Sequence, residues 1–222
     1  YRKNLKLNGT SKVLMKKNRA YDFSAVNHLV NKYFQPEELI ELNNVGVQCH
    51  QLYMPPPIFV PRYFSYNKDA LLESKLLIDE AASPVNDSFP TKIYISRRDG
   101  NNNSMGSRDI VDRAILNSGV LENAGFSIIE LSNLDPEEQI VLFQGATHVA
   151  GIHGAGLMNI IFSQKGRCSV TEILAEPWSY YTIAMFSNFL EMDYAAFAPN
   201  EIVIEDTLSE FGYKTLFERL VK

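Results

Sequence analysis

The most informative segment of the chain is VAGIHGAGLMN, residues 149–159. Its first four residues form an apolar run typical of a short buried strand, and the apolar residues after Gly156 predict a helix. The two glycines between strand and helix leave room for a ligand near the backbone, and the first amides of a helix have no intrahelical partners. The segment therefore predicts a ligand that carries a phosphate or a diphosphate.

His153 stands at the mouth of this turn, where it could add a hydrogen-bond donor or a proton-transfer group. A tight turn that binds nothing is the competing interpretation. The spacing G-x-G-x-x-N lacks the third glycine of a dinucleotide-binding fingerprint, so it is a weak signal by itself.

Strands and helices alternate regularly around this segment, from about Thr91 to the end of the chain. Short connections between them imply right-handed crossovers and a parallel sheet covered on both faces. We therefore expect an α/β fold, a Rossmann-like parallel sheet with helices on both faces, over residues 91–222. The expected strands span residues 92–96, 126–131, 147–152, 169–174 and 193–197, and the expected helices span 108–124, 135–145, 157–162, 179–190 and 207–222.

Two helix ends in this region carry strong local signals. Gly125 stands where the C-terminal cap of the helix at 108–124 belongs. Asp135-Pro136, followed by Glu138, has the spacing of a capping box with proline at the first helical position.

The first ninety residues are less regular and predict a partial N-terminal α/β unit followed by a linker. The chain is thereby divided into residues 1–90 and the Rossmann-like domain at 91–222. Within the N-terminal part we expect strands at 11–15 and 45–53, helices at 36–42 and 70–82, and a linker at 83–90.

The composition excludes several classes of protein. A net charge of −5 argues against non-specific nucleic-acid binding. The two cysteines lie far apart without CxxC spacing, so they predict neither a disulfide framework nor a zinc motif and fit a reducing compartment. No apolar run approaches the roughly 18–20 residues that span a bilayer, so no transmembrane segment is expected. No D-x-D occurs, so we expect neither a carboxylate-bound Mg²⁺ or Mn²⁺ nor any cofactor.

Polar residues follow or end three of the expected strands, where ligands bind in open parallel sheets. They are Ser96-Arg97-Arg98, the turn at His153, and Glu172. Arg97 could hold a diphosphate with two parallel hydrogen bonds, and Glu172 could accept hydrogen bonds from ribose hydroxyls. A solvated surface arginine and a structural ion pair are the alternatives for these two residues.

The motifs between Tyr94 and Tyr194 together resemble glycosyltransferase family 61. They form an ordered series over a little under half of the chain, which is far more specific than any single motif. The matching segments are Tyr94-Ile95-Ser96-Arg97, Arg108-Asp109-Ile110, Ala124-Gly125-Phe126, Glu138-Gln139-Ile140, Leu142-Phe143, Ala146, HGAGLMN at 153–159, Thr171-Glu172-Ile173 and Tyr194.

The resemblance implies a GT-B architecture of two Rossmann domains. Residues 91–222 would form its C-terminal, donor-binding half, and residues 1–90 would lie on the acceptor side. It also implies inverting, metal-independent transfer of a sugar from a nucleotide-diphosphate-sugar donor to a glycan or protein hydroxyl. Bacterial relatives serve the biosynthesis of capsule and other surface polysaccharides. A cytoplasmic location is expected for a bacterial protein and the lumen of the secretory pathway for a eukaryotic one.

The expected site combines the residue analysis with this resemblance. His153 and Arg97 are the expected catalytic residues, because they would stabilise charge on the leaving diphosphate. Glu172 would hold the ribose, and Asn159 would fix the turn or the ligand. The expected donor-binding residues are Ser96, Arg97, Arg108, His153, Gly154, Ala155, Gly156, Asn159 and Glu172.

Departures from the family pattern keep other functions open. Asp112-Arg113 stands where the family often has Asn-Glu, and the family's His-Trp element is not visible. The first alternative is a degenerate relative that binds a nucleotide sugar or a partner without transfer. A sugar-nucleotide epimerase and a Rossmann-like interaction module without a ligand are the others. The general base is unknown, with His28, His50, Asp22 and Asp112 as candidates.

Overall fold

A computed structural model describes residues 13–15, 39–41, 59–60, 65–66, 68–81, 88–98, 106–174, 181–198, 203–204 and 207–222. The chain divides into two compact units, residues 1–70 and 71–222, which are described separately below. The boundary expected near residue 90 from the sequence falls within the second unit.

The first unit contributes two short strand pairs. Strand β1 (Val13–Met15) runs parallel to β2 (Leu39–Glu41), and β3 (Phe59–Val60) runs antiparallel to β4 (Ser65–Tyr66). The short helix expected at 36–42 is therefore wrong, because Leu39 and Ile40 take part in strand pairing with β1 instead. The expected strand at 45–53 lies outside the described residues, and the partial α/β character of residues 1–90 stays a prediction.

A five-stranded parallel sheet forms the second unit, and it confirms the expected Rossmann-like α/β fold. Its order is β6-β5-β7-β8-β9, and every neighbouring pair is parallel. Numbered within the sheet this is 2-1-3-4-5, the flavodoxin-like doubly wound order. The GT-B architecture stays a prediction. The strands are β5 (Lys92–Ile95), β6 (Ser127–Ile129), β7 (His148–Ile152), β8 (Ser169–Ile173) and β9 (Asp193–Phe197).

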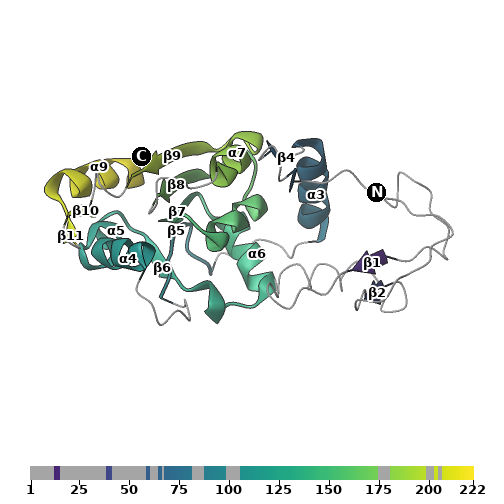
Figure 1. Cartoon of the computed structure of the whole chain (residues 1–222), viewed down its shortest axis with the longest axis horizontal. Helices are drawn as coiled ribbons and strands as arrows, with labels where there is room; N and C mark the ends of the chain where they lie inside the picture. Colours follow the sequence, from purple (N-terminus) through teal and green to yellow (C-terminus); the bar gives the residue numbers. More distant parts are fainter. Residues whose placement is uncertain are drawn as a thin grey trace. The chain divides into compact units, whose positions relative to one another are not determined.

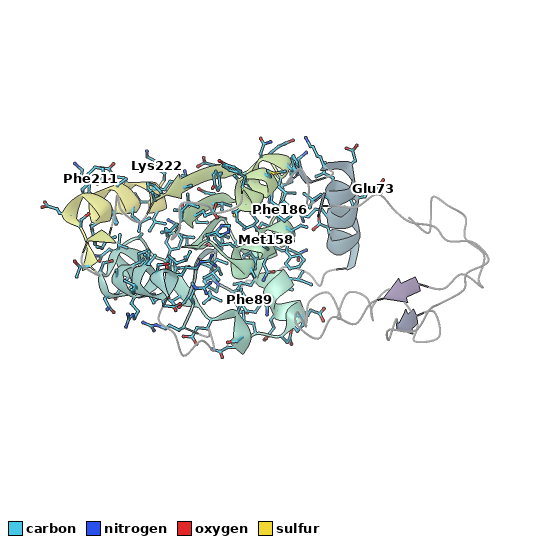
Figure 2. All side chains as sticks on the ribbon, in the orientation of Figure 1. Glu73, Phe89, Met158, Phe186, Phe211 and Lys222 are labelled. Atoms are coloured by element: carbon cyan, nitrogen blue, oxygen red, sulfur yellow. The ribbon has the colours of Figure 1, made fainter. Side chains whose placement is uncertain are left out.

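Helices cover both faces of this sheet (Figure 1). Tyr94, Ala150 and Ile173 point to one face and share a buried cluster with helices α4 (Ser107–Asn117), α5 (Val120–Asn123) and α9 (Glu210–Leu220). The other face carries α6 (Pro136–Gly145), the 3₁₀-helix η4 (Ala155–Phe162) and α7 (Thr182–Phe189). Figure 2 marks Met158 of η4 and Phe186 of α7 in this second layer, and Phe211 of α9 in the first.

The remaining described elements are the helix α3 (Lys68–Ala81), the 3₁₀-helix η3 (Leu131–Asn133) and the hairpin of β10 (Val203–Ile204) with β11 (Thr207–Leu208). Helix α3 agrees with the helix expected at 70–82. Among the helices that the structure describes, none is both long enough and apolar enough to cross a membrane.

The two capping signals are confirmed. The Glu138 amide donates to Asp135 Oδ1, and the Asp135 amide donates to Glu138 Oε2, both at 2.8 Å. Gly125 adopts a φ of 77°, and the Phe126 amide reaches back to the Leu121 carbonyl at 2.8 Å, which completes a Schellman cap.

Three helices differ from their expected form. The helix expected at 108–124 is broken between α4 and α5 because Gly119 adopts a φ of 73°. The closing helix begins at Glu210, since Ser209 caps it and the two residues before Ser209 form β11. Segment η4 winds as a 3₁₀-helix, whose period of three places Leu157 and Ile160 in one buried row.

Arg219 of α9 clamps the edge strand β9 to β8 at the amino ends of both strands. Its guanidinium donates to the carboxylate and the carbonyl of Asp193, to the Val170 carbonyl at 3.2 Å, and to Thr171 Oγ1 at 3.3 Å. The side chain is only 13% exposed. Hydrogen bonding to Arg219 is also the main reason that the pKa of Asp193 is lowered.

We expect Arg219→Met to lower the free energy of unfolding by about 2 kcal/mol, since it leaves the buried Val170 carbonyl without this donor. For a domain of this size that loss corresponds to about 4–8 °C in melting temperature, measured by circular dichroism. Arg113→Met, on the exposed side of α4, is the matched control and should change the melting temperature little. Equal effects of the two substitutions would contradict the clamp.

Candidate functional site

A cavity of about 240 Å³ opens at the carboxyl ends of β5 and β7. It lies where the strand order reverses, because β6 and β7 are the two neighbours of β5. After β5 the chain turns to α4 on one face of the sheet, and after β7 it turns to η4 on the other. Such a switch point is where doubly wound sheets bind ligands. The cavity is lined by Ile95, Ser96, Arg97, Leu131, Ile152, Gly154, Gly156 and Leu157.

Two residues with unpaired backbone amides, Gly154 and Gly156, line this cavity. Gly154 is the N-terminal cap of η4, and the first hydrogen bond of the helix runs from the Leu157 amide to the Gly154 carbonyl at 3.1 Å. Within the described part of the chain, the amides of Gly154, Ala155 and Gly156 have no hydrogen-bond acceptor. Successive free amides at a helix start favour an anion.

The Arg97 side chain lies against this turn. Its Nη1 would be 3.0 Å from a Cβ placed on Gly154, so the guanidinium and the glycine backbone are in close contact. Its Nε is 3.5 Å from Asp109 Oδ1, yet that buried nitrogen has no hydrogen-bond partner among the described residues. Arg97 therefore brings a positive charge and unused donor capacity to this turn.

The two glycines of the turn have different roles. Gly154 has an extended backbone with φ of 167°, which alanine can adopt, and only the Arg97 side chain stands close to its missing Cβ. A Cβ on Gly156 would instead lie 3.0 Å from Ile95 Cγ2 and 3.1 Å from Leu131 Cδ1. Gly156 is thus required for the packing of η4, while Gly154 leaves the space that Arg97 uses.

Asp112 supports the turn after β5 from the α4 side. Its carboxylate accepts hydrogen bonds from Tyr94 Oη at 2.7 Å, from Ser96 Oγ at 3.2 Å and from the Arg97 amide at 3.2 Å. Asp112 is 2% exposed and does not line the cavity, so it is out of reach of an acceptor hydroxyl and fails as the candidate base. The Ser96 hydroxyl also accepts from the Arg98 amide, so Ser96 shapes the turn.

Asn159 ties η4 to its neighbours. Its Nδ2 donates to Gln139 Oε1 at 3.1 Å, and Gln139 in turn donates to the carbonyls of Leu131 and Leu134. Asn159 does not line the cavity. Of the two roles expected for it, the contacts support fixing the turn.

Glu172 is buried at the end of β8, with 1% exposure. Its Oε1 pairs with His153 Nδ1, and its Oε2 accepts from Tyr194 Oη at 2.5 Å. The expected His153 and Glu172 are therefore in direct contact, although neither lines the cavity. Both Glu172 oxygens are engaged within the protein, which argues against the expected contact with ribose.

The other expected residues lie around this centre. Ala155 is exposed at the start of η4, and Arg108 is half-buried in the first turn of α4 and outside the cavity lining. The candidate bases His28, His50 and Asp22 lie outside the described residues. In the described ranges no three histidine, cysteine or carboxylate side chains gather in a group that could hold a metal ion.

Asp109, Gln139 and Tyr194 were expected only as motif positions, and their supporting contacts were not predicted. The structural role of Asp112 was not predicted either. A signal for Asp112 exists, because it lies one position after Val111 and three before Ile115 on the buried stripe of its helix. A carboxylate on such a stripe needs internal donors. For Tyr194 no local signal exists, since its partner is on another strand.

Burial raises the pKa of Asp112, so the folded chain takes up a proton at a higher pH than the unfolded chain does. A raised folded-state pKa gives stability that is complete below the unfolded pKa and is lost as pH rises through the folded pKa. We therefore expect the wild type to gain stability relative to Asp112→Asn as pH falls from about 7 to about 4. Denaturant titrations at several pH values measure the difference in unfolding free energy between the two proteins. A wild type that loses stability relative to Asp112→Asn on acidification would refute the raised pKa of Asp112.

Comparison with known proteins identifies the family. A family model described as Glycosyltransferase 61 matches residues 11–170, which include β5, β7 and the turn between β7 and η4. A search of curated proteins found no match. Among solved structures, the flavodoxin-like domain of a Synechococcus sp. protein is similar over 58% of this chain and 92% of that chain, with 15% identity and a TM-score of 0.39. The family match spans more than half of the chain, and the chain therefore belongs to glycosyltransferase family 61.

Proposed function

We propose that the cavity at β5 and β7 holds the diphosphate of a nucleotide-sugar donor, and that the sugar passes with inversion to a glycan or protein hydroxyl. One observation carries the donor part of this proposal. Two residues with unpaired amides at the start of η4, Gly154 and Gly156, line a cavity together with Arg97 at the switch point of the sheet.

The expected chemistry is an in-line displacement at the anomeric carbon. The acceptor oxygen forms a bond to that carbon while the bond to the β-phosphate oxygen breaks, and the nucleoside diphosphate leaves. Negative charge then grows on the β-phosphate, where the turn amides and Arg97 would stabilise it. A general base must take the acceptor proton, and Asp112 is too deeply buried to do so.

The positive groups at the cavity support transfer without a metal ion. An arginine and a row of amides can neutralise a leaving diphosphate, which is the task that Mg²⁺ or Mn²⁺ performs where a D-x-D motif binds it. This chain contains no D-x-D. We therefore propose that donor binding persists in the presence of a chelator.

The cavity volume suits part of the donor. At about 240 Å³ it is smaller than the roughly 300–1,000 Å³ of a pocket that encloses a whole small ligand. Its apolar wall consists of Ile95, Leu131, Ile152 and Leu157. We propose that the diphosphate occupies the polar side of this cavity and that other parts of the donor extend beyond it.

The departure at Asp112-Arg113 gives little support to a relative that binds without transfer. Asp112 lies under the turn after β5 and Arg113 is exposed, and neither lines the cavity. The replaced charges therefore leave the donor side of the site intact.

A panel of UDP, GDP, ADP, CDP and dTDP, tested with EDTA present, should contain a ligand that raises the melting temperature. At about 100 times its Kd it would stabilise by about 2.7 kcal/mol, or about 5–10 °C. Arg97→Ala should weaken that ligand about tenfold or more, because charge-assisted hydrogen bonds to the phosphate are lost. His153→Ala should also weaken it.

Gly154→Ala is the sharper variant, because its methyl group would displace the Arg97 guanidinium without straining the backbone. We expect a normal melting temperature without ligand and a reduced shift with ligand. Arg113→Ala, which removes an exposed arginine away from the cavity, serves as the control. Wild-type affinity in both Arg97→Ala and Gly154→Ala would eliminate this site.

A further inference from the structure

Three side chains on neighbouring strands form a hydrogen-bonded row beside the cavity. Glu172 of β8 lies between His153, which directly follows β7, and Tyr194 of β9. The strand register places all three on one face, because Glu172 is paired with Gly151 and Tyr194 is paired with Val170. This is the face that carries η4.

Glu172 depends on its two partners. A buried carboxylate is costly unless hydrogen bonds or an opposite charge compensate it. Among the described residues, its hydrogen-bonding partners are His153 and Tyr194, one on each oxygen. The carboxylate can only accept, so the Tyr194 hydroxyl donates and His153 Nδ1 carries the hydrogen of its bond.

Tyr194 is suited to be a permanent donor. Burial is the main cause of its raised pKa, and the neighbouring Glu172 adds to the effect, so the phenol stays protonated at neutral pH. Its hydrogen bond occupies Oε2 and restrains rotation of the carboxylate. Oε1 is thereby held in the direction of the imidazole.

The consequence for His153 concerns its other nitrogen. Nδ1 is committed to Glu172, and Nε2 has no partner among the described residues. The side chain retains 12% exposure and is adjacent in sequence to Gly154, the cap whose amide is unpaired. Nε2 is therefore the atom that His153 can offer to an anion at the turn, and it donates there when the ring carries a hydrogen on both nitrogens.

We propose that Tyr194 is a positioning residue, which acts through Glu172 to orient the His153 ring so that Nε2 serves the donor diphosphate. This inference rests on the proposed function for its ligand. It also replaces the expected role of Glu172: the carboxylate orients His153 and does not bind ribose.

The orientation can be read directly by NMR of protein labelled with ¹⁵N-histidine. The chain has four histidines, and His153→Gln identifies the signals of His153. In the wild type we expect a hydrogen on Nδ1 of His153, because the hydrogen bond of a ring nitrogen selects the tautomer. In Tyr194→Phe we expect the form protonated only on Nε2 to appear.

Binding is measured with inorganic pyrophosphate, which tests the diphosphate contacts whatever the nucleoside. Tyr194→Phe should bind it about threefold to tenfold more weakly, the usual range for loss of one net hydrogen bond. Tyr213→Phe is the matched control, because it also removes a hydrogen-bonded tyrosine hydroxyl, one that accepts from Asn123 Nδ2 at 2.7 Å on the opposite layer. It should leave both measurements unchanged.

Glu172→Gln gives a second route if Tyr194→Phe folds poorly, since the amide no longer presents two equivalent acceptors. It too should populate the Nε2-protonated form. Wild-type tautomer signals in both variants would overturn the positioning role. A changed tautomer with unchanged pyrophosphate affinity would overturn the link to the ligand. If the wild type binds no diphosphate, the proposed function fails, while the tautomer measurement still decides the positioning role.

Discussion

The site depends on one constraint of topology: β5 and β7 are neighbours in the sheet, but the chain leaves them toward opposite faces. The two departing segments separate, and a cavity remains above the ends of the strands. Gly154 and Gly156, whose amides have no acceptor among the described residues, line that cavity. An anion in that space would satisfy donors that the fold itself leaves unpaired.

Two buried carboxylates support the two turns from different sides. Asp112 reaches the turn after β5 from α4, and Glu172 reaches the turn after β7 from β8. Each is compensated by hydrogen bonds, which a buried negative charge requires. Each also contacts a nitrogen of a turn residue, the Arg97 amide in one case and His153 Nδ1 in the other. Both carboxylates lie outside the lining of the cavity, whereas Arg97 belongs to it.

Local signals were enough to predict much of the fold. The strands and the caps at Gly125 and Asp135 follow from residue periodicity and from hydrogen bonds within a few residues. The break at Gly119 was not predicted, because the left-handed conformation of this glycine interrupts an otherwise helical pattern. The strand β2 was not predicted, because its partner β1 is distant in sequence and the pairing overrides the local helix pattern. In the site, Arg97 and Gly154 were expected at the same edge of the sheet, because each follows a predicted parallel strand. The hydrogen-bonding partners of Glu172 and Asp112 could not be predicted, because they lie on other strands and helices whose adjacency the sequence does not give.

The winding of η4 limits how this enzyme can vary. A 3₁₀-helix turns about 120° per residue and an α-helix about 100°, so rewinding the segment would rotate Ile160 by about 60° relative to Leu157. Both side chains are fully enclosed, and that rotation would pull one of them out of the protein interior. Leu157 and Ile160 therefore fix the direction of the end of η4 that lies at the cavity. If the cavity holds the donor as proposed, differences in donor preference among related enzymes would arise from its other walls.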